Sequence, residues 1–289
     1  MDENHEADDF YARMGGRFPS YDVPFLEGGR PERVERNLAM VLAYDGAGFA
    51  GWQMQANKRT IQGEVEKVLS LLCDEPIRVE ASGRTDAGVH AWGQVAGFCT
   101  KSRLSLTRLS AGLKALLPPE ICLRRLEPVP EGFHARFDAR AKTYDYFLWP
   151  QAPAALFLRD RLWPLPFALD PEPMRQALLA FKGESDFKAL AFRGNQAPGP
   201  TLRRVLEADL CLEPSGIWRV RVIATGFLRH VIRNLVGVLA QVGAGRLSSS
   251  QMCEMLAAGK RLYSGPKAPP GGLYLNRVYY QDIKAAGQR

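Results

Sequence analysis

Histidine and cysteine, the side chains that most often build metal and redox sites, are few and scattered in this sequence. There are four histidines and five cysteines in 289 residues, and no two cysteines have the close spacing of a zinc or redox motif. No two histidines form an H-x-x-x-H pair, the pattern of a zinc hydrolase. We therefore expect no disulfide and no metal site, and a reducing cytoplasm is the simplest setting.

The sequence also lacks a long apolar run that is free of charge. Its most apolar stretch, residues 220–242, contains Arg221, Arg229 and Arg233, and burying such charges in a bilayer is costly. The first residues, MDENHE, do not have the basic-then-apolar order of a signal peptide. We expect a soluble protein with no membrane partner.

Acidic residues are absent between Glu213 and Glu254, a stretch that holds five arginines. The net charge of the chain is +7, yet residues 1–36 hold nine acidic and five basic side chains, so the positive excess lies in the remainder. Basic stripes attract polyanions, with a strong dependence on salt. Charge alone leaves two interpretations open, a nucleic-acid partner and a solvated basic surface.

Hydrophobic patterning predicts an α+β protein of two similar halves with a largely antiparallel sheet. Strands and helices alternate, but several neighbouring strands have no helix between them, which parallel strands would require. Strands are expected at 37–44, 77–81, 93–98, 121–126, 142–149, 205–212, 217–225 and 273–282. Helices are expected at 62–73, at 107–117, from Asp170 onward, at 227–242 and from Ser249 onward. We divide the chain into a loosely ordered acidic arm (1–36), an N-terminal half (37–140) and a C-terminal half (141–289).

Residues 82–90, SGRTDAGVH, form a polar loop between two expected strands and are called the Asp86 loop below. Its glycines would let a substrate backbone approach closely, and an ionised Asp86 beside Arg84 would suit a nucleophile or a general base. An ordinary turn with a local ion pair is the alternative. The glycine spacing matches neither a dinucleotide-binding loop nor a P-loop.

The longer segment GRTDAGVHAWGQV closely resembles the active-site motif of the TruA-type tRNA pseudouridine synthases. Four further blocks resemble that family in the same order: LAYDGAGFAGWQMQ followed by TIQGEVE, FHARFDARAKTYDY, FLRHVIRNLVGVLAQVGAGR and APPGGLYLNRVYY. Together the blocks cover residues 37–283. The resemblance implies a pseudouridine synthase fold, in which two similar α+β halves surround a basic cleft. It also implies a homodimer, with tRNA as the partner and no metal or organic cofactor.

The resemblance further implies a role for each matching residue. Asp86 corresponds to the catalytic aspartate, and Arg84 to the arginine that helps displace the target nucleotide. Tyr144 corresponds to the tyrosine that packs against the uracil ring, and Arg233 to the basic residue that pairs with the aspartate. The implied reaction converts uridine to pseudouridine at positions 38, 39 and 40 of the tRNA anticodon stem-loop. Whether Asp86 attacks C1′ or removes a ribose proton stays open.

Periodicity within the expected elements bears on these roles. In the helix expected at 227–242, Arg229 and Arg233 lie on one polar side with Gly237, so Arg229 is expected to face RNA. Strand alternation places Lys142, Tyr144 and Tyr146 on one face, as a base-stacking platform would need. A core tyrosine is the alternative for Tyr144. In the helix after Asp170, the expected buried residues are Met174, Ala177, Leu178 and Phe181.

Two other functions remain open on the sequence. One is a tRNA-binding protein or RNA chaperone without catalytic activity on the same scaffold. The other is a metal-dependent nuclease that uses Asp86 and His90, although no further carboxylates cluster near that loop. The glycine- and proline-bearing loop at 191–200 matches no family block, and we interpret it as a segment that shapes which tRNAs are accepted.

Overall fold

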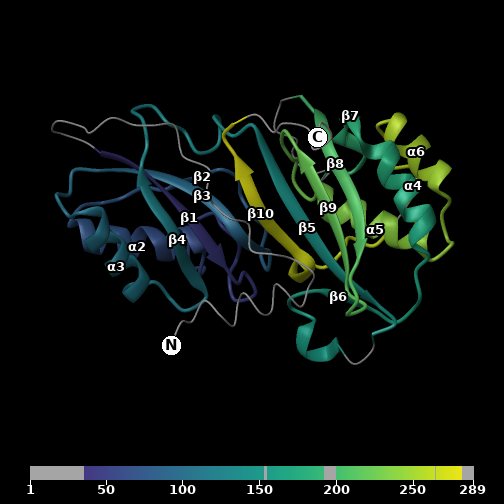
Figure 1. Ribbon diagram of the computed structural model, residues 1–289, viewed down its shortest axis with the longest axis horizontal. Helices are drawn as coiled ribbons and strands as arrows, with labels where there is room; N and C mark the ends of the chain where they lie inside the picture. The colour runs from purple at the N-terminus through teal and green to yellow at the C-terminus, as the bar shows by residue number, and fades with distance from the viewer. Residues whose placement is uncertain (1–35, 153–154, 192–199, 264, 282–289) are drawn as a thin grey trace. The chain divides into compact units, whose positions relative to one another are not determined.

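The computed structural model describes residues 36–152, 155–191, 200–263 and 265–281, which fall into two compact units (Figure 1). Residues 36–140 and 275–281 form one unit, called the Asp86 unit, and residues 141–274 form the other, called the Tyr144 unit. The expected acidic arm ends where the described residues begin, so that expectation lies outside them. Most of the loop expected at 191–200 also lies outside them.

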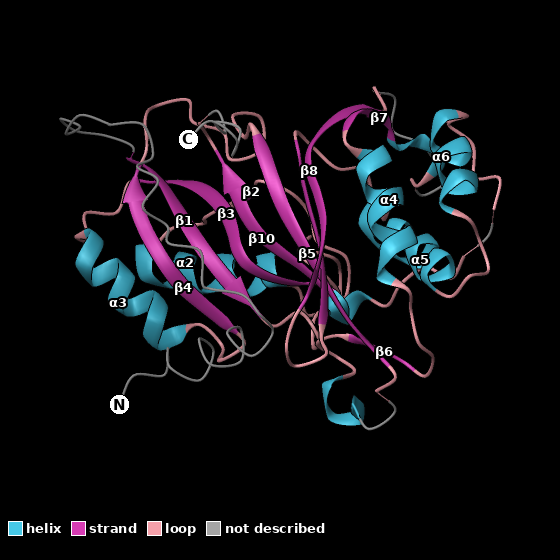
Figure 2. Ribbon diagram, turned by 45° about the vertical axis from the view of Figure 1, so that its right-hand side comes forward, coloured by secondary structure: helices cyan, strands magenta, loops and turns pink. Residues whose placement is uncertain are grey.

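The Asp86 unit is an antiparallel sheet covered by two helices. Its strands are β1 (Arg36–Tyr44), β2 (Glu80–Ala81), β3 (His90–Thr100), β4 (Ile121–Pro128) and most of β10 (Leu273–Tyr279), which enters this unit at residue 275. The order is β4-β1-β3-β10, and β2 pairs with β3. Helices α2 (Ile61–Cys73) and α3 (Leu106–Leu116) lie against one face of this sheet (Figure 2).

Both helices of this unit begin at residues that suit the start of a helix. The Thr60 side chain accepts a hydrogen bond from the Gly63 N–H at the start of α2, and Ser105 caps α3 in the same way. The buried side of α2 includes Val65 and Leu69, as its spacing predicts. The two helices confirm the sequence-based expectation to within one residue.

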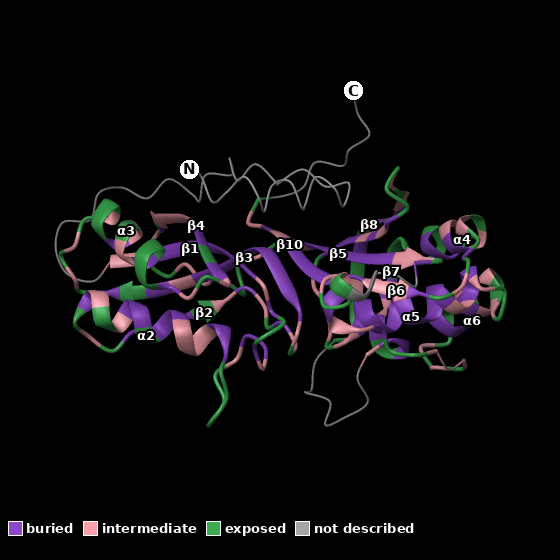
Figure 3. Ribbon diagram, turned by 90° about the horizontal axis from the view of Figure 1, so that it is seen from below, coloured by how far each residue is buried: buried purple, intermediate pink, exposed green. Residues whose placement is uncertain are grey.

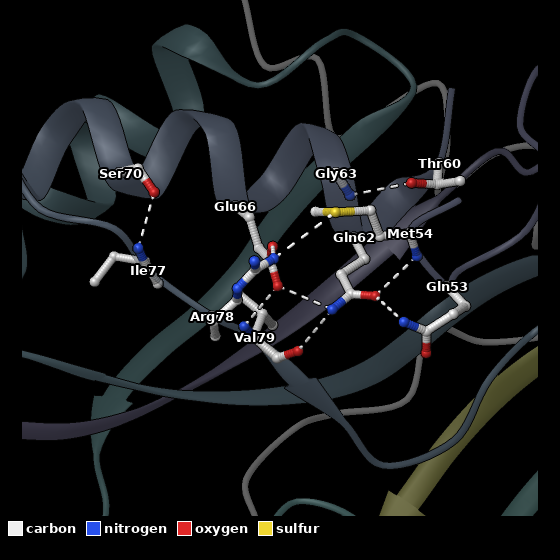
Figure 4. Close-up of polar contacts among 10 residues, drawn as sticks. All are labelled: Gln53, Met54, Thr60, Gln62, Gly63, Glu66, Ser70, Ile77, Arg78 and Val79. Carbon is white, nitrogen blue, oxygen red and sulfur yellow. Dashed lines mark hydrogen bonds and ion pairs between the residues drawn. The ribbon is translucent and has the colours of Figure 1, made fainter. Parts of the chain in front are cut away.

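The strand expected at 77–81 is much shorter in the structure, where only Glu80 and Ala81 pair as β2. The backbone N–H groups of Ile77 and Val79 donate instead to side chains of α2 (Figure 4). Ile77 donates to Ser70 Oγ and Val79 to Glu66 Oε1, both at 2.9 Å. Because these N–H donors are satisfied by side chains, residues 77–79 need no neighbouring strand. Alternating apolar residues in the sequence therefore did not indicate a strand here.

The Tyr144 unit combines five strands, most of them paired antiparallel, with three α-helices. Its strands are β5 (Ala141–Pro150), β6 (Trp163–Leu165), β7 (Gly183–Asp186), β8 (Leu202–Leu212) and β9 (Trp218–Ala224). The order is β5-β9-β8-β7, all antiparallel, and β6 alone pairs in parallel, with β5. Its helices are α4 (Pro171–Phe181), α5 (Val231–Gly243) and α6 (Ser249–Ala257). The expected α+β fold with a largely antiparallel sheet is therefore confirmed.

Helix α4 follows the sequence-based expectation closely. Asp170 accepts a hydrogen bond from the Glu172 N–H, and Pro171 occupies the first helical position. The residues predicted to be buried are indeed buried: Met174, Ala177, Leu178 and Phe181. The short helix expected from Ser249 is α6, which Ser248 and Gln251 begin with a capping box.

Helix α5 begins at Val231, so the start expected at residue 227 is wrong. His230 has φ 67°, a left-handed conformation that cannot continue a helix backwards. Arg229 therefore precedes the helix and is exposed. The expected polar side is also wrong, because Arg233, Asn234 and Gly237 are all buried. Figure 3 shows α5 mostly in purple, the colour of buried residues.

Polar residues can be buried in α5 because neighbouring backbone groups pair with them. Arg233 Nε donates to the Ala268 carbonyl at 2.8 Å, and Asn234 Nδ2 donates to the Leu190 carbonyl at 2.6 Å. No helix of the described part of the chain is long and apolar enough to cross a membrane.

Candidate active site

The Asp86 loop joins β2 to β3 and exposes its residues to different degrees. Thr85 is buried, Asp86 is half-buried and Arg84 is exposed. A backbone hydrogen bond from Val89 N–H to the Asp86 carbonyl, 3.1 Å long, closes the turn after Asp86. The loop thus leaves a carboxylate and a guanidinium accessible while its other side is anchored in the unit.

Gln94, from β3, holds the start of the loop. Its Oε1 accepts a hydrogen bond from Ser82 Oγ at 2.7 Å, and its Nε2 donates to the Gly83 carbonyl at 2.7 Å. Gln94 and Ser82 are both fully buried. A buried amide satisfied in this way fixes the path of the backbone around it.

Segment 44–52 holds the centre and the end of the loop. Tyr44 Oη lies 2.9 Å from Thr85 Oγ1, and the Trp52 N–H donates to the Thr85 carbonyl at 3.1 Å. Gly46 and Gly51 lie so close to the loop that added Cβ atoms would overlap the loop backbone. Only glycine permits this approach, and both glycines belong to the block LAYDGAGFAGWQMQ.

His90 is buried and participates in the anchoring of the loop. Its Nδ1 lies 3.1 Å from the Gly46 nitrogen and 3.1 Å from Asp45 Oδ1. The hydrogen bond from the Gly46 N–H to Nδ1 joins the last residue of the loop to the turn after β1. No group of three or more potential metal ligands occurs among the residues that the structure describes.

Tyr144 and Tyr146 lie on one face of β5, as strand alternation predicts. Tyr144 is 8% exposed, and its ring meets that of Phe227 edge-on with centroids 4.9 Å apart. Tyr146 is fully buried, and its hydroxyl donates to the Pro269 carbonyl at 2.9 Å. Burial raises the pKa of Tyr146 well above its ordinary value, so its hydroxyl stays protonated.

Arg233 lies close to this tyrosine face. Its guanidinium donates to the Ala268 carbonyl, while the Ala268 N–H donates back to the Arg233 carbonyl at 3.1 Å. Its positive charge acts on Tyr146 and partly offsets the effect of burial on that pKa. Tyr144, Tyr146 and Arg233 therefore belong to one region of the Tyr144 unit.

The site residues are divided between the two units. Arg84 and Asp86 belong to the Asp86 unit, and Tyr144, Arg229 and Arg233 to the Tyr144 unit. The pairing of Arg233 with Asp86 stays a prediction. Tyr44, Gln94 and Thr85 were not singled out by sequence reasoning, although all three lie within quoted family blocks. A buried hydrogen-bonded polar residue has no period or spacing that marks it in a sequence.

Three of the five arginines between Glu213 and Glu254 have polar partners outside that stretch. Arg221 forms a two-pronged ion pair with Asp145, Arg219 lies 3.6 Å from Glu213, and Arg233 binds a backbone carbonyl. The absence of acidic residues along a stretch therefore does not make that stretch a free basic surface.

Comparison with known proteins identifies the family. The model of the tRNA pseudouridine synthase family matches residues 40–138 and 177–281. A tRNA pseudouridine synthase A of Citrifermentans bemidjiense is 40% identical over 249 residues, covering 86% of this chain and 98% of the relative. That of Ruminiclostridium cellulolyticum is 36% identical over 245 residues, covering 85% of this chain and all of the relative. That of Methylacidiphilum infernorum is 40% identical over 249 residues, covering 84% and 97%.

The family match spans the Asp86 loop and the segments that hold it, as well as α5 and β10. The chain therefore belongs to the tRNA pseudouridine synthase family.

Proposed function

We propose that this chain isomerises uridine to pseudouridine in tRNA and that Asp86 acts on the ribose of the target nucleotide. The observation that carries the proposal is the Asp86 loop, in which a half-buried carboxylate is held by buried partners within the segment that the family model matches. A rigid mounting of an accessible carboxylate is what a positioned nucleophile or base requires.

The reaction breaks the C1′–N1 bond, turns the uracil and joins C5 to C1′. Nothing is added or lost overall, and the hydrogen on C5 must leave as a proton. Asp86 either attacks C1′ or removes a ribose proton to give a glycal. Both routes need an ionised Asp86 at the ribose, so both predict the same loss when the carboxylate is removed.

A uridine within a stem must leave its stack before it can react, which costs a few kcal/mol. We assign to exposed Arg84 the role of occupying the vacated space and contacting phosphate. Tyr144 offers a ring against which the uracil packs, an interaction worth roughly 1–3 kcal/mol. Arg233 is assigned as the partner of Asp86, and exposed Arg229 as a contact to the RNA backbone.

The proposal extends to the target positions and to the state of the protein. We assign uridines 38, 39 and 40 of the anticodon stem-loop as targets, and we infer a cytoplasmic homodimer. The support is the resemblance of five ordered sequence blocks to the TruA-type enzymes.

The test is to map pseudouridine in an unmodified tRNA after incubation with the protein, with and without a metal chelator. We expect pseudouridine at positions 38–40 under both conditions, and none with Asp86→Ala. Glu131→Ala, which removes an exposed carboxylate from the same unit, is the matched control and should act as the wild type does. RNA cleavage that depends on a divalent metal would favour a nuclease. Binding of tRNA without formation of pseudouridine would favour a chaperone.

A further inference from the structure

The Tyr44 hydroxyl lies beside the residue that precedes Asp86. Tyr44 is the last residue of β1 and is 4% exposed. Its oxygen is 2.9 Å from Thr85 Oγ1 and 3.4 Å from Gln94 Nε2. Burial raises the pKa of Tyr44 well above its ordinary value. The phenol therefore stays protonated at neutral pH and can donate a hydrogen bond, but it cannot act as a base.

The hydrogen bonds around this hydroxyl form a continuous chain. Ser82 Oγ donates to Gln94 Oε1, and Gln94 Nε2 donates to the Gly83 carbonyl and to the Tyr44 oxygen. The Tyr44 and Thr85 hydroxyls share the last hydrogen bond of the chain, in which either can be the donor. The chain therefore links the first residues of the loop to the residue immediately before Asp86.

Thr85 is held through its backbone as well as through its side chain. Its carbonyl accepts a hydrogen bond from the Trp52 N–H. Gly51 lies directly behind it, where an added Cβ would be 2.7 Å from the Thr85 oxygen and 3.0 Å from the Asp86 carbonyl carbon. A threonine fixed at its hydroxyl and at its carbonyl leaves the backbone of Asp86 little freedom to move.

We propose that Tyr44 is a positioning residue for the reaction, whose hydroxyl holds the Asp86 loop through Thr85 in the geometry that the chemistry requires. This inference rests on the proposed role of Asp86. Tyr44 contacts no substrate in this account and acts only through the loop. Because displacement of a reacting group by about 1 Å can lower a rate by about 100-fold, a small relaxation of the loop has a measurable effect.

The first variants remove the hydrogen bond between Tyr44 and Thr85, called the bridge, from either of its two residues. Tyr44→Phe and Thr85→Val each delete one hydroxyl with little change of volume, and Thr85→Ser keeps the hydroxyl as a conservative rescue. We expect the first two to lower the single-turnover rate constant by about 10- to 100-fold and to leave the Kd for tRNA within about twofold. Thr85→Ser should recover most of the rate. The double variant should lose no more than the worse single variant, because both changes break one bridge.

Tyr280→Phe controls for the loss of a hydrogen-bonded, half-buried tyrosine hydroxyl as such. Tyr280 lies in the same unit, and its hydroxyl donates to the Ala135 carbonyl at 2.7 Å, away from the Asp86 loop. We expect its thermal midpoint to fall about as much as that of Tyr44→Phe, with no loss of the single-turnover rate. Equal loss of rate in both folded variants would overturn the positioning role, because it would show a general effect of lower stability.

The outcomes separate this inference from the proposed function. If Asp86→Ala is inactive and Tyr44→Phe reacts at the wild-type rate, the positioning role is wrong and the role of Asp86 stands. If Asp86→Ala keeps the wild-type rate, the proposed role of Asp86 is wrong, and with it the inference. Should Tyr44→Phe fail to fold, the comparison of Thr85→Val with Thr85→Ser decides, and equal rates for the two would overturn the positioning role.

Discussion

Asp145 and Arg221 occupy facing positions on β5 and β9 and show how a single ion pair can fix two strands. Arg221 Nε and one of its terminal nitrogens lie 2.7 and 2.8 Å from the two oxygens of Asp145, which is 0% exposed. Such a two-pronged pair is geometrically specific. Burying the Asp145 carboxylate costs desolvation free energy, and a well-placed partner is needed to offset that cost.

Arg221→Met should lower the free energy of unfolding by about 3–5 kcal/mol, because it removes the two-pronged partner of a buried carboxylate. Adding Asp145→Leu to that variant should restore most of the stability, because no buried charge then remains. Urea unfolding of the full chain measures both effects. A double variant that is no more stable than Arg221→Met would contradict this view of the pair.

At the scale of elements, the turn after β1 owes its position to a glycine. An added Cβ on Gly46 would lie 2.6 Å from the Val89 carbonyl carbon, whereas one on Gly48 would meet only the end of the Arg59 side chain, at 3.6 Å. Neither glycine has a positive φ, so the difference between them is one of space.

Gly46→Ala should therefore displace the Asp86 loop, lowering both the thermal midpoint and the rate of pseudouridine formation. Gly48→Ala is the matched control, two residues away, and should keep both within the error of the measurement. The comparison requires only a thermal melt and a single-turnover assay of each variant. Equal behaviour of the two variants would show that the close approach of Gly46 to Val89 does not hold the loop.

Elements with strong local signals were predicted well from the sequence. Asp170-Pro171 gave the start of α4, because the cap and the fixed φ of proline act within one turn. The start of α5 was missed because Arg229 continues the helical spacing, while the backbone at His230 is left-handed. Strand β2 was expected too long because the N–H groups of Ile77 and Val79 bond to side chains that only the fold brings near.

In the candidate site, the sequence predicted the residues assigned to the reaction but not the buried residues that hold them in place. Motif and resemblance singled out Arg84, Asp86, Tyr144 and Arg233, and helical periodicity singled out Arg229. The roles of all five are proposals. The partners that hold Asp86 in place could not be found, because Tyr44 is separated from Thr85 by 41 positions in the chain. A contact of this kind depends on the packing of strands and leaves no periodic trace.

At the scale of the whole molecule, charge counted along the sequence is a poor guide to charge on the surface. Arg221 is paired and Arg233 is buried, although both lie in a stretch without acidic residues. Arg84 and Arg229, by contrast, are exposed. We expect exposed basic side chains to attract tRNA, because only accessible charges can neutralise phosphates.

The release of tritium from tRNA labelled at uridine C5, measured for the wild type and for Asp86→Ala, tests whether the protein forms pseudouridine and needs Asp86 to do so. Joining C5 to C1′ must expel that hydrogen, so the signal reports the proposed chemistry itself. We expect release by the wild type and none by a folded Asp86→Ala variant that still binds tRNA. Release by Asp86→Ala at the wild-type rate, or none by well-folded wild type with any tRNA, would contradict this expectation.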